Sequence, residues 1–393
     1  MNRRDALLST AALACSTGLL PAQTNQKLRV AVIGHTGRGD YGHGLHTLWL
    51  PIPAVELIGV ADPDPAGLAA AQKKLGGVAG FADYRNMLAT TKPDIVAICM
   101  RYIDPHRDIA LAAIAAGVRG IYLEKSFCRT LAEADEIVAA CESKKVKLAL
   151  AHRNRYHPVL PVVKKLVAEG AVGRLLEIRG RGKEDARGGG VDLHVLGSHV
   201  LNLFQYFAGD PQACSATVFQ AGKPITKADI IEGAEGLGLV AGNEIHARFE
   251  MAAGIPAFFD SVQKAEGKAG FGLQFIGTQG VIDIRIDKEP LAHYCQGSPF
   301  LPTGEARVWK PISTAGIGQP EPIAELGPLV LEHRLAANDL IAAIREDRQP
   351  LCNPREGLAI MEMIAGVFES QRLQGARVAF PLAARENPLS RFE

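Results

Sequence analysis

The stretch from residue 28 to residue 62 constrains the fold of this chain more than any other part of the sequence. Residues 28–34 form a short run rich in apolar and β-branched side chains, which is typical of a buried parallel strand. A glycine-rich turn follows at residues 34–39, and a second apolar run at residues 55–61 ends at Asp62. This order of strand, tight turn, helix start, second strand and acid is the fingerprint of a dinucleotide-binding unit.

The turn matches the dinucleotide pattern only in part. Thr36 stands at the second glycine position of the pattern, where the backbone approaches phosphate most closely. We expect Gly37 to supply the missing room. A flexible turn without a ligand is the alternative, which the flanking strands and Asp62 disfavour. The cofactor-binding candidates in this turn are Gly34, Thr36, Gly37, Arg38 and Gly39.

Asp62 indicates which dinucleotide binds. It follows Gly34 by 28 residues, somewhat more than the usual spacing of about 20. A carboxylate at this point bonds the ribose hydroxyls and would repel a 2′-phosphate. We therefore expect NAD rather than NADP as the cofactor.

Composition narrows the class of protein. A chain of 393 residues, 47% of them hydrophobic, is long enough for two domains with a large core. The 43 basic and 42 acidic residues leave a formal net charge of +1, so nothing indicates a nucleic acid or an anionic membrane as partner. The seven cysteines are scattered without metal-ligand spacing, and we expect no metal site. Small molecules and further copies of the chain are the expected partners.

The first 27 residues are typical of an export signal rather than of the fold. Arg3 and Arg4 precede a small and apolar segment that ends near Ala22. This order resembles a twin-arginine signal, which predicts export to the periplasm. A lipoprotein anchored at Cys15 and a merely basic N-terminus are the alternatives. The segment is too short to span a bilayer comfortably, and no membrane span is predicted elsewhere.

Between Asp62 and residue 151 the chain alternates helices and buried strands. Helices are predicted at residues 65–75, 81–90, 109–116 and 131–144, and strands at residues 94–99, 118–123 and 147–151. This alternation predicts an α/β domain over residues 28–152, with a Rossmann-like doubly wound parallel sheet. The fourth strand delivers Glu124 and Lys125 at its carboxyl end, the edge at which ligands bind in such sheets.

Residues 153–393 are predicted to form an α+β domain for substrate binding and oligomerisation, built on an open, mostly antiparallel sheet. A glycine turn between the fourth and fifth of its predicted strands is typical of a hairpin. The stretch 296–328 is predicted to be an extended loop or arm, and helices between residues 334 and 372 close the chain. The predicted strands are residues 215–220, 244–251, 255–262, 271–277 and 281–286.

At Glu124 and Lys125 the chain resembles the Gfo/Idh/MocA family of oxidoreductases. In that family the lysine of a Glu-Lys-Pro motif lies beside the nicotinamide and the reacting carbon, and Ser126 replaces the proline here. The resemblance covers nearly everything from residue 28 to the end of the chain. It rests also on Pro105-His106, residues 153–158, the triglycine 188–190 leading to His199, residues 333–339 and residues 353–357.

This resemblance implies a fold, a chemistry and a set of contacts. It implies hydride transfer between NAD and a small carbohydrate, with His106, Glu124 and Asn154 at the cofactor and Arg155 at the substrate. In the family the exposed face of the second sheet forms the subunit interface, so a homo-oligomer is implied as well.

Lys125 and His199 are the predicted polar pair at the reacting centre. Removing a hydride from a carbinol also requires that a proton leave the hydroxyl. A lysine near the nicotinamide cation can have a lowered pKa and hydrogen-bond the reacting oxygen. The alternatives are an exposed lysine after a strand and a core histidine that is bonded to a backbone carbonyl.

The helix around His199 departs from the family pattern. Family members usually carry an aspartate one turn before the histidine, but this position is Val195, and Asn202 stands where a second acid is common. Asp192 and His194 are the substitutes that the chain offers, as acid/base or substrate-binding residues. If the helix already exists at Asp192, seven residues, or two turns, return it to the face of His199.

The charged run at residues 179–187 stands just before the triglycine. Lys183 is the candidate in this run for lining a polar pocket for a sugar or an acidic group. A solvated loop is the alternative.

Two enzyme classes fit these features. The favoured one is an NAD-dependent oxidoreductase that transfers a hydride between nicotinamide and a ring carbon of a sugar, cyclitol or glycoside. The alternative is a glycoside hydrolase or lyase, whose tightly bound NAD oxidises the sugar only transiently. Three features support this alternative: the export signal, the missing aspartate, and the segment His194-x-x-Gly197. This segment resembles a His-x-x-Gly motif of exported NAD-dependent α-N-acetylgalactosaminidases. A cofactor-binding protein without catalysis is the third interpretation.

Overall fold

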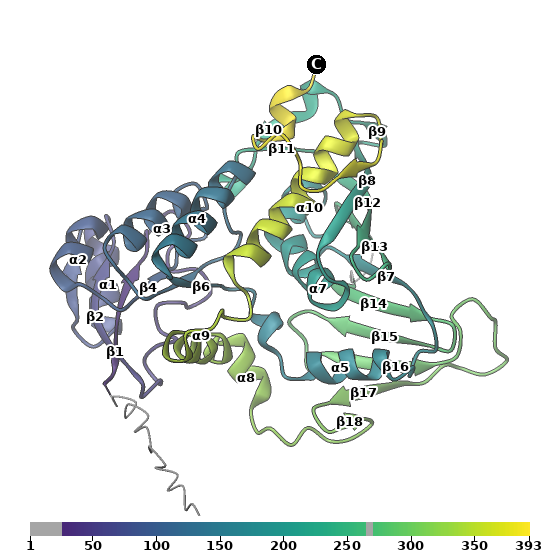
Figure 1. Ribbon diagram of the computed structural model, residues 1–393, viewed down its shortest axis with the longest axis horizontal. Helices are drawn as coiled ribbons and strands as arrows, with labels where there is room; N and C mark the ends of the chain where they lie inside the picture. Colours follow the sequence, from purple (N-terminus) through teal and green to yellow (C-terminus); the bar gives the residue numbers. More distant parts are fainter. Residues whose placement is uncertain (1–25, 265–269) are drawn as a thin grey trace, which may run out of the picture.

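The computed structural model describes residues 26–264 and 270–393 and shows two sheets with helices packed between and around them (Figure 1). The predicted export signal up to residue 25, with Arg3, Arg4 and Cys15, lies outside the described residues. None of the helices in the described ranges is both long and apolar enough to cross a membrane.

The first sheet has six parallel strands in the order β3-β2-β1-β4-β5-β6, which is the Rossmann order. The predicted doubly wound sheet is thereby confirmed. The short outer strand β3 was not predicted, because its three residues carry no apolar run. The strands are β1 (Leu28–Ile33), β2 (Val55–Ala61), β3 (Ala79–Phe81), β4 (Ile95–Ile98), β5 (Gly120–Leu123) and β6 (Lys147–Leu150).

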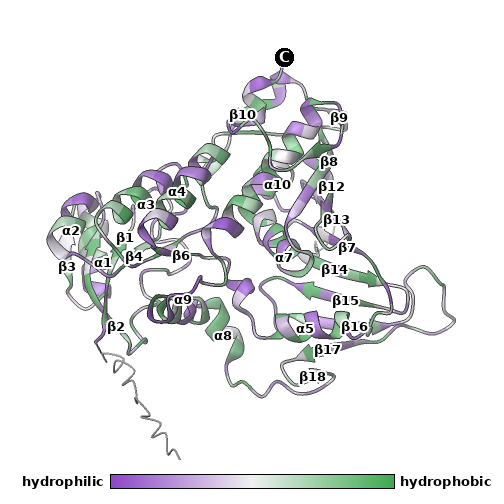
Figure 2. Cartoon of the chain, viewed as in Figure 1, coloured by the Kyte–Doolittle hydropathy of each residue, from purple (hydrophilic) through white to green (hydrophobic). Residues whose placement is uncertain are grey.

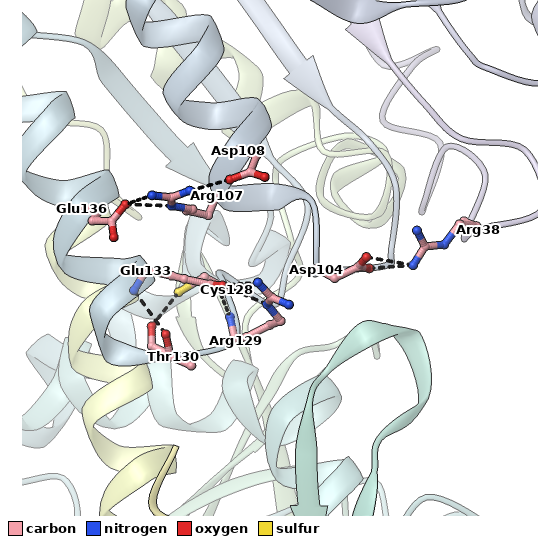
Figure 3. Close-up of polar contacts among 9 residues, drawn as sticks. All are labelled: Arg38, Asp104, Arg107, Asp108, Cys128, Arg129, Thr130, Glu133 and Glu136. Atoms are coloured by element: carbon pink, nitrogen blue, oxygen red, sulfur yellow. Dashed lines mark hydrogen bonds and ion pairs between the residues drawn. The ribbon is translucent and has the colours of Figure 1, made fainter. Parts of the chain in front are cut away.

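Four helices of this part lie close to their predicted places. The helix predicted from residue 81 begins later, because Phe81 belongs to β3 and Asp83 caps the helix. The side chain of Thr130 likewise caps α4 by accepting a hydrogen bond from the amide of Glu133 (Figure 3). The helices are α1 (Pro65–Lys74), α2 (Tyr84–Thr91), α3 (His106–Ala115) and α4 (Leu131–Lys144).

The helix expected directly after the glycine turn does not form. Residues 36–51 instead run as a series of turns between β1 and β2. Gly37, Gly39, Gly42 and Gly44 all have positive φ angles, so left-handed residues recur every two or three positions and interrupt any right-handed helix. The predicted support of a phosphate by a helix N-terminus is therefore absent from this turn.

The second sheet has eleven strands and is antiparallel except where β13 pairs with β7. The predicted hairpin is formed by β14 and β15. A separate ribbon pairs β10 (Ile230–Glu232) with β11 (Leu239–Ala241). The strands of the large sheet are β7 (Leu175–Arg181), β8 (Pro211–Gln220), β9 (Lys223–Pro224), β12 (Glu244–Met251), β13 (Pro256–Val262), β14 (Gly272–Gly277), β15 (Gly280–Arg285), β16 (Ala292–Gln296), β17 (Trp309–Ser313), β18 (Gly316–Ile317) and β19 (Val378–Ala379).

Two stretches of this half differ from a simple loop. The charged run at residues 179–187, for which a solvated loop was the alternative, begins within the strand, because its first three residues continue β7. The stretch 296–328 is not only an extended arm, because it contributes β17 and β18 to one edge of the sheet. Edge strands need few apolar residues, so their sequences carry a weak signal.

The closing helices connect the two sheets. Helix α9 (Arg334–Glu346) packs on β5 and β6, and α10 (Pro354–Arg372) contacts both α4 and β8. The amide of Leu150, at the end of β6, donates a hydrogen bond to the carbonyl of Cys352 just before α10. Figure 2 shows hydrophobic residues along β14 and β15 and helices of mixed character around the sheets. The remaining helices of the second half are α5 (Val159–Ala168), α6 (Gly190–Asp192), α7 (Ser198–Ala208) and α8 (Leu326–Leu331).

Candidate functional site

A cavity of about 260 Å³, here called the central cavity, lies where the carboxyl ends of β4, β5 and β6 face α7. A second cavity of about 660 Å³, the outer cavity, shares Lys183, Leu196 and Asp287 with it. Ligands of doubly wound sheets bind at this edge, so the central cavity is the candidate site. Its lining residues are His43, Arg101, Lys125, Ala151, Arg153, Lys183, Arg187, Val195, Leu196, His199, Glu235, Asp287 and His333.

Lys125 reaches this cavity from the end of β5 and is only 5% exposed. Its Nζ donates a hydrogen bond to the carbonyl oxygen of Val195 at 3.3 Å. Burial lowers the pKa of Lys125, although the negative charges of Glu124 and Glu235 oppose this shift. A lysine in this state can be neutral and available to a substrate hydroxyl.

Glu124 is fully buried behind Lys125. Its carboxylate lies 3.2 Å from Nδ1 of His43, which comes from the turns after β1. Burial opposes ionisation, but the hydrogen bond and charge of His43 hold the pKa of Glu124 at about 2. Glu124 therefore anchors the segment after the glycine turn, and it does not line the central cavity.

His199 lines the cavity from α7, beside a histidine that the sequence analysis did not single out. Nδ1 of His199 lies 3.3 Å from Nδ1 of His152, and the two rings are perpendicular. Burial lowers the pKa of both, to about 3 for His152. One of the two Nδ1 atoms donates a hydrogen and the other accepts it, which leaves Nε2 of His199 for a ligand. The available signal for His152 was its place directly after the predicted strand 147–151.

The helical segment before His199 contains one wide π turn at Leu193–Gly197, between α6 and α7. A π turn has more residues per turn than an α-helix, so the seven residues from Asp192 to His199 do not complete two turns. Asp192 is fully buried and accepts hydrogen bonds from the hydroxyl of Ser261 at 2.6 Å and from the amides of Lys183 and Glu184. The condition for Asp192 to face His199, a regular helix from Asp192 onward, is not met, and the carboxylate of Asp192 instead holds the loop after β7.

His194 also points away from the central cavity. Its ring stacks on Phe368 of α10 with centroids 6.3 Å apart, beside a different and smaller cavity. Neither ring nitrogen has a hydrogen-bond partner among the described residues, and burial lowers the pKa of His194 to about 4. The structure therefore places His194 in the core and not among the groups that could meet a substrate.

Arg155 and Asn154 also lie apart from Lys125. The guanidinium of Arg155 lies over the ring of Tyr206 and bonds Glu356 at 3.3 Å, in a separate cavity of about 520 Å³. Asn154 donates to the carboxylate of Asp287 at 2.9 Å, and Asp287 itself lines the central cavity. Arg155 is thus outside the candidate site, while Asn154 positions one of its acids.

His106 is fully buried in the first turn of α3. Its ring nitrogens lie 2.9 Å from the carbonyl oxygen of Met100 and 3.0 Å from that of Ser126. It therefore joins the loop after β4 to the residue that follows Lys125. The predicted cofactor contact of His106 is replaced by a positioning role, because its ring is enclosed by protein.

The carboxylate of Asp62 holds the glycine turn in place through hydrogen bonds. The fully buried carboxylate accepts hydrogen bonds from the amide and the hydroxyl of Thr36, at 3.1 and 2.7 Å, and from the hydroxyl of Tyr41 at 2.9 Å. The amide of Asp64 is a fourth donor, at 3.0 Å, so the protein's own groups occupy the carboxylate in this conformation. The predicted bond from Asp62 to the cofactor ribose is therefore not available here, and Asp62 positions the turn.

The turn is also joined to the loop after β4. The guanidinium of Arg38 lies 2.9 Å from the carboxylate of Asp104 (Figure 3). It also stacks over the ring of Tyr102. A Cβ added to Gly39 would lie 2.6 Å from the amide nitrogen of Arg101, so only glycine permits this approach. These two loops flank the point where the strand order reverses, between β1 and β4, which is where dinucleotides bind in this fold.

These features fit a dinucleotide. Gly37 has a φ of +82°, has no neighbour within 4 Å of its Cβ position, and so offers an exposed backbone. The backbone of Gly37 and Gly39 and the guanidinium groups of Arg38 and Arg101 are the groups that would hold the diphosphate. Gly34 is less accessible, because the ring of Tyr41 covers it.

Comparison with known proteins agrees with this site. Residues 28–152 match the sequence profile of the Gfo/Idh/MocA family, an oxidoreductase family with an NAD-binding Rossmann fold. The chain is 25% identical over 349 residues to levoglucosan dehydrogenase from Pseudarthrobacter phenanthrenivorans, across 75% of this chain and 86% of that enzyme. It is 29% identical over 217 residues to D-apiose dehydrogenase from Paraburkholderia graminis, across 53% of this chain and 56% of that enzyme.

The similarity of fold to a solved structure also extends over most of the chain. The solved structure of levoglucosan dehydrogenase with NADH and levoglucosan is similar with a TM-score of 0.71 at 22% identity, over 91% of this chain and all of that one. The chain is an NAD-dependent oxidoreductase, and its residues 28–152 are similar to the NAD-binding domain of the Gfo/Idh/MocA family. The fold class and the cofactor predicted from the sequence are thereby confirmed, and the family resemblance is supported for residues 28–152.

His194→Phe tests whether this histidine is structural. An unfolded chain protonates the ring below its usual pKa of 6.5, whereas the folded chain resists protonation until about pH 4. Stability from the buried neutral ring is therefore lost as the pH falls from 6.5 towards 4, by up to about 3 kcal/mol. We expect the variant to keep turnover and to lose less stability than the wild type between pH 7 and 5 in urea unfolding.

A matched variant is His246→Phe, in which an exposed histidine is replaced. Its ion pairs with Glu244 and Asp260 raise its pKa, although its partial burial opposes this. Because the pKa of His246 is raised and that of His194 is lowered, His246→Phe should not reduce the loss of stability in acid. Collapse of turnover in His194→Phe, with the fold intact, would contradict the structural role.

Proposed function

We propose that this protein transfers a hydride between NAD and a ring carbon of a sugar, cyclitol or glycoside. The observation that carries the proposal is the pairing of Lys125 and His199, both buried with lowered pKa values, in one cavity at the ligand-binding edge of the Rossmann sheet. The named relatives, which act on levoglucosan and D-apiose, support a carbohydrate as the substrate.

The chain's own residues supply the proton chemistry. Bound NAD supplies the hydride acceptor. Nζ of Lys125 binds and orients the reacting hydroxyl oxygen, and Nε2 of His199 takes the hydroxyl proton as the hydride leaves. Nδ1 of His199 can then pass its hydrogen to Nδ1 of His152, 3.3 Å away, so the positive charge is shared over two rings. His152 thus takes the supporting place of the aspartate that Val195 replaces.

The same arrangement favours the deprotonated forms of both Lys125 and His199. Burial disfavours the charged forms of Lys125 and His199 and lowers the pKa of each. In the oxidation direction the rate should rise with pH through one acid limb and then stay level.

Lys125→Ala removes the group that orients the reacting oxygen. We expect the reduction of NAD by substrate to fall by about 100-fold or more, because one general acid/base group contributes 10²–10⁴-fold. Binding of NAD, followed by quenching of protein fluorescence, should remain, since the turn and Asp62 are untouched. Near-normal turnover in this variant would place the reacting centre elsewhere.

His152→Leu removes the partner of His199 while leaving the cavity lining intact. The nearby His152 is one of the causes that lower the pKa of His199, so without it the acid limb should move to higher pH. The maximal rate should also fall, by roughly 10-fold, because Nδ1 loses its acceptor. The pH profile of kcat/KM checks both effects.

His152→Asn is the conservative comparison, because its amide can bond Nδ1 of His199 without titrating. It should restore much of the maximal rate. A pH profile that is the same in the wild type and in His152→Leu would argue that His152 acts only through packing.

The glycosidase or lyase alternative is not favoured. The curated relatives with named activities are dehydrogenases, and His194 of the His-x-x-Gly segment lies outside the central cavity. Absorbance of reduced nicotinamide during incubation with sugars and aryl glycosides distinguishes the two. Stoichiometric reduction of added NAD supports the oxidoreductase, whereas cleavage without net reduction would reinstate the alternative.

Export and oligomerisation complete the proposal. The arginine pair and apolar segment in residues 1–27 support export to the periplasm by the twin-arginine route, which fractionation of expressing cells would test. The second sheet supports a homo-oligomer, since alternate residues of β12 such as His246 and Arg248 are exposed while their neighbours are buried. Light scattering of the folded protein, compared with Arg248→Glu, would test whether this face joins subunits.

A further inference from the structure

The ribbon of β10 and β11 brings a carboxylate from the second half of the chain to the central cavity. The turn between its two strands places Glu235 in the lining of this cavity, together with Lys125 and His199. The other carboxylate of the lining, Asp287, is bound by Arg153 at 2.9 Å. The carboxylate of Glu235 makes no ion pair or hydrogen bond with any residue in the described ranges, so it has no structural use of its own.

Contacts from three sides fix the position of the ribbon. The amide of Ile103, in the loop after β4, donates a hydrogen bond to the backbone carbonyl of Glu235 at 3.0 Å. Near the end of the chain, the side-chain amide of Asn387 donates to the carbonyl of Leu239 at 2.9 Å. The ribbon also shares a small apolar cluster with the segment before α7, formed by the buried side chains of Ile103, Val195, Leu237 and Val240. The place of Glu235 at the cavity is therefore set by the fold.

The backbone of this turn is closely fitted to the loop after β4. Glu235 has a φ of +57°, in the left-handed region that residues other than glycine rarely adopt. A Cβ added to the next residue, Gly236, would lie 2.3 Å from Oδ1 of Asp104, whose carboxylate is bound by Arg38 (Figure 3). A residue is held in such a conformation only where the surrounding structure imposes it, and these residues cluster at ligand-binding sites.

Two cations of the cavity lie near the carboxylate of Glu235 without pairing with it. Its negative charge acts on Lys125, at the end of β5, and on Arg187, in the loop between β7 and α6. Each of these cations has another partner, since Nζ of Lys125 bonds the carbonyl of Val195 and Arg187 binds Asp185. An acceptor and two donors thus border the same cavity of about 260 Å³ without closing it, an arrangement that suits an uncharged ligand with several hydroxyl groups.

We propose that Glu235 binds the substrate by accepting a hydrogen bond from a second hydroxyl of the sugar, apart from the hydroxyl that reacts beside Lys125 and His199. The inference rests on the proposed function and deepens it by naming the residue that selects among sugars. A carboxylate can only accept hydrogen bonds, so it distinguishes a hydroxyl from a hydrogen atom at that ring carbon. Because Lys125 binds the reacting oxygen, the two contacts together determine which ring carbon stands at the reacting centre.

The test combines substitution of Glu235 with removal of single hydroxyl groups from the sugar. D-glucose, levoglucosan and myo-inositol are offered to the full chain with NAD, and reduction of NAD gives kcat/KM for each. The sugar with the highest kcat/KM is then compared with its monodeoxy analogues. In the wild type, the analogue that lacks the bound hydroxyl should lose about 10- to 100-fold in kcat/KM, the usual effect of one charge-assisted hydrogen bond.

Glu235→Ala removes the acceptor, so it should react with the parent sugar and with that analogue at nearly equal kcat/KM. Glu235→Gln keeps the length of the side chain and removes its charge, and it should lower kcat/KM for the parent sugar by about 10-fold. Glu232→Gln is the matched control, since Glu232 is exposed on the same ribbon and does not line the central cavity. It should keep the wild-type values. Binding of NAD, followed by quenching of protein fluorescence, should be unchanged in all three variants.

The outcomes separate the role of Glu235 from the proposed function. If the analogues lose as much in Glu235→Ala and Glu235→Gln as in the wild type, Glu235 does not bind the substrate, and the proposed function still stands. Weaker binding of NAD in Glu235→Gln, with the losses of the analogues unchanged, would assign the carboxylate to the cofactor and overturn the proposal. Failure of all three sugars to reduce NAD would count against the carbohydrate oxidoreductase itself and against this inference with it.

Discussion

Three fully buried carboxylates determine how the rest of this site is arranged. Asp62 holds the glycine turn, Glu124 holds the segment after it through His43, and Asp192 holds the loop that carries Lys183. A buried charge is costly unless it is paired or hydrogen-bonded, so each carboxylate strongly favours the one loop conformation that satisfies it. None of the three lines the central cavity, and each holds a loop or turn that borders the candidate site.

The buried surroundings that require these hydrogen bonds also affect the protonation of the basic side chains. Lys125, His199 and His152 lie in surroundings that disfavour their charged forms, and the neighbouring cations add to the effect. A proton accepted here cannot stay on one isolated ring without a large cost. Val195 stands where family members usually carry a carboxylate, so no acid neutralises a positive charge on His199. The contact between the two histidines lowers the cost of that charge in another way, because it spreads the charge over two rings.

The sequence indicated the strands because each is a short apolar run with a fixed period, and the order of strands and helices then led to the Rossmann sheet. Lys125 and His199 could be predicted because each stands at a recognisable point of that order. The roles of Asp62, Asp192 and His194 could not. The roles of Asp192 and His194 depend on a single π turn at Leu193–Gly197. Those of Asp62 and Asp192 depend on partners far away along the chain, such as Thr36 for Asp62 and Ser261 for Asp192. His152 was missed for the same reason, since only the folded chain brings it to His199.

The proposed reacting centre belongs to neither sheet alone. Lys125 comes from the end of β5, whereas His199 comes from α7 beside the large sheet, and Nζ of Lys125 bonds the carbonyl of Val195 across the junction. The relative position of the two bases is therefore only as fixed as the packing of α9 on β5 and β6 and of α10 between α4 and β8. Because Leu150 and Cys352 join β6 to the start of α10 by a backbone hydrogen bond, the strand that ends beside His152 is tied to the helix that joins the two halves. Closing helices far from the chemistry in sequence thus set the distance over which a proton has to move.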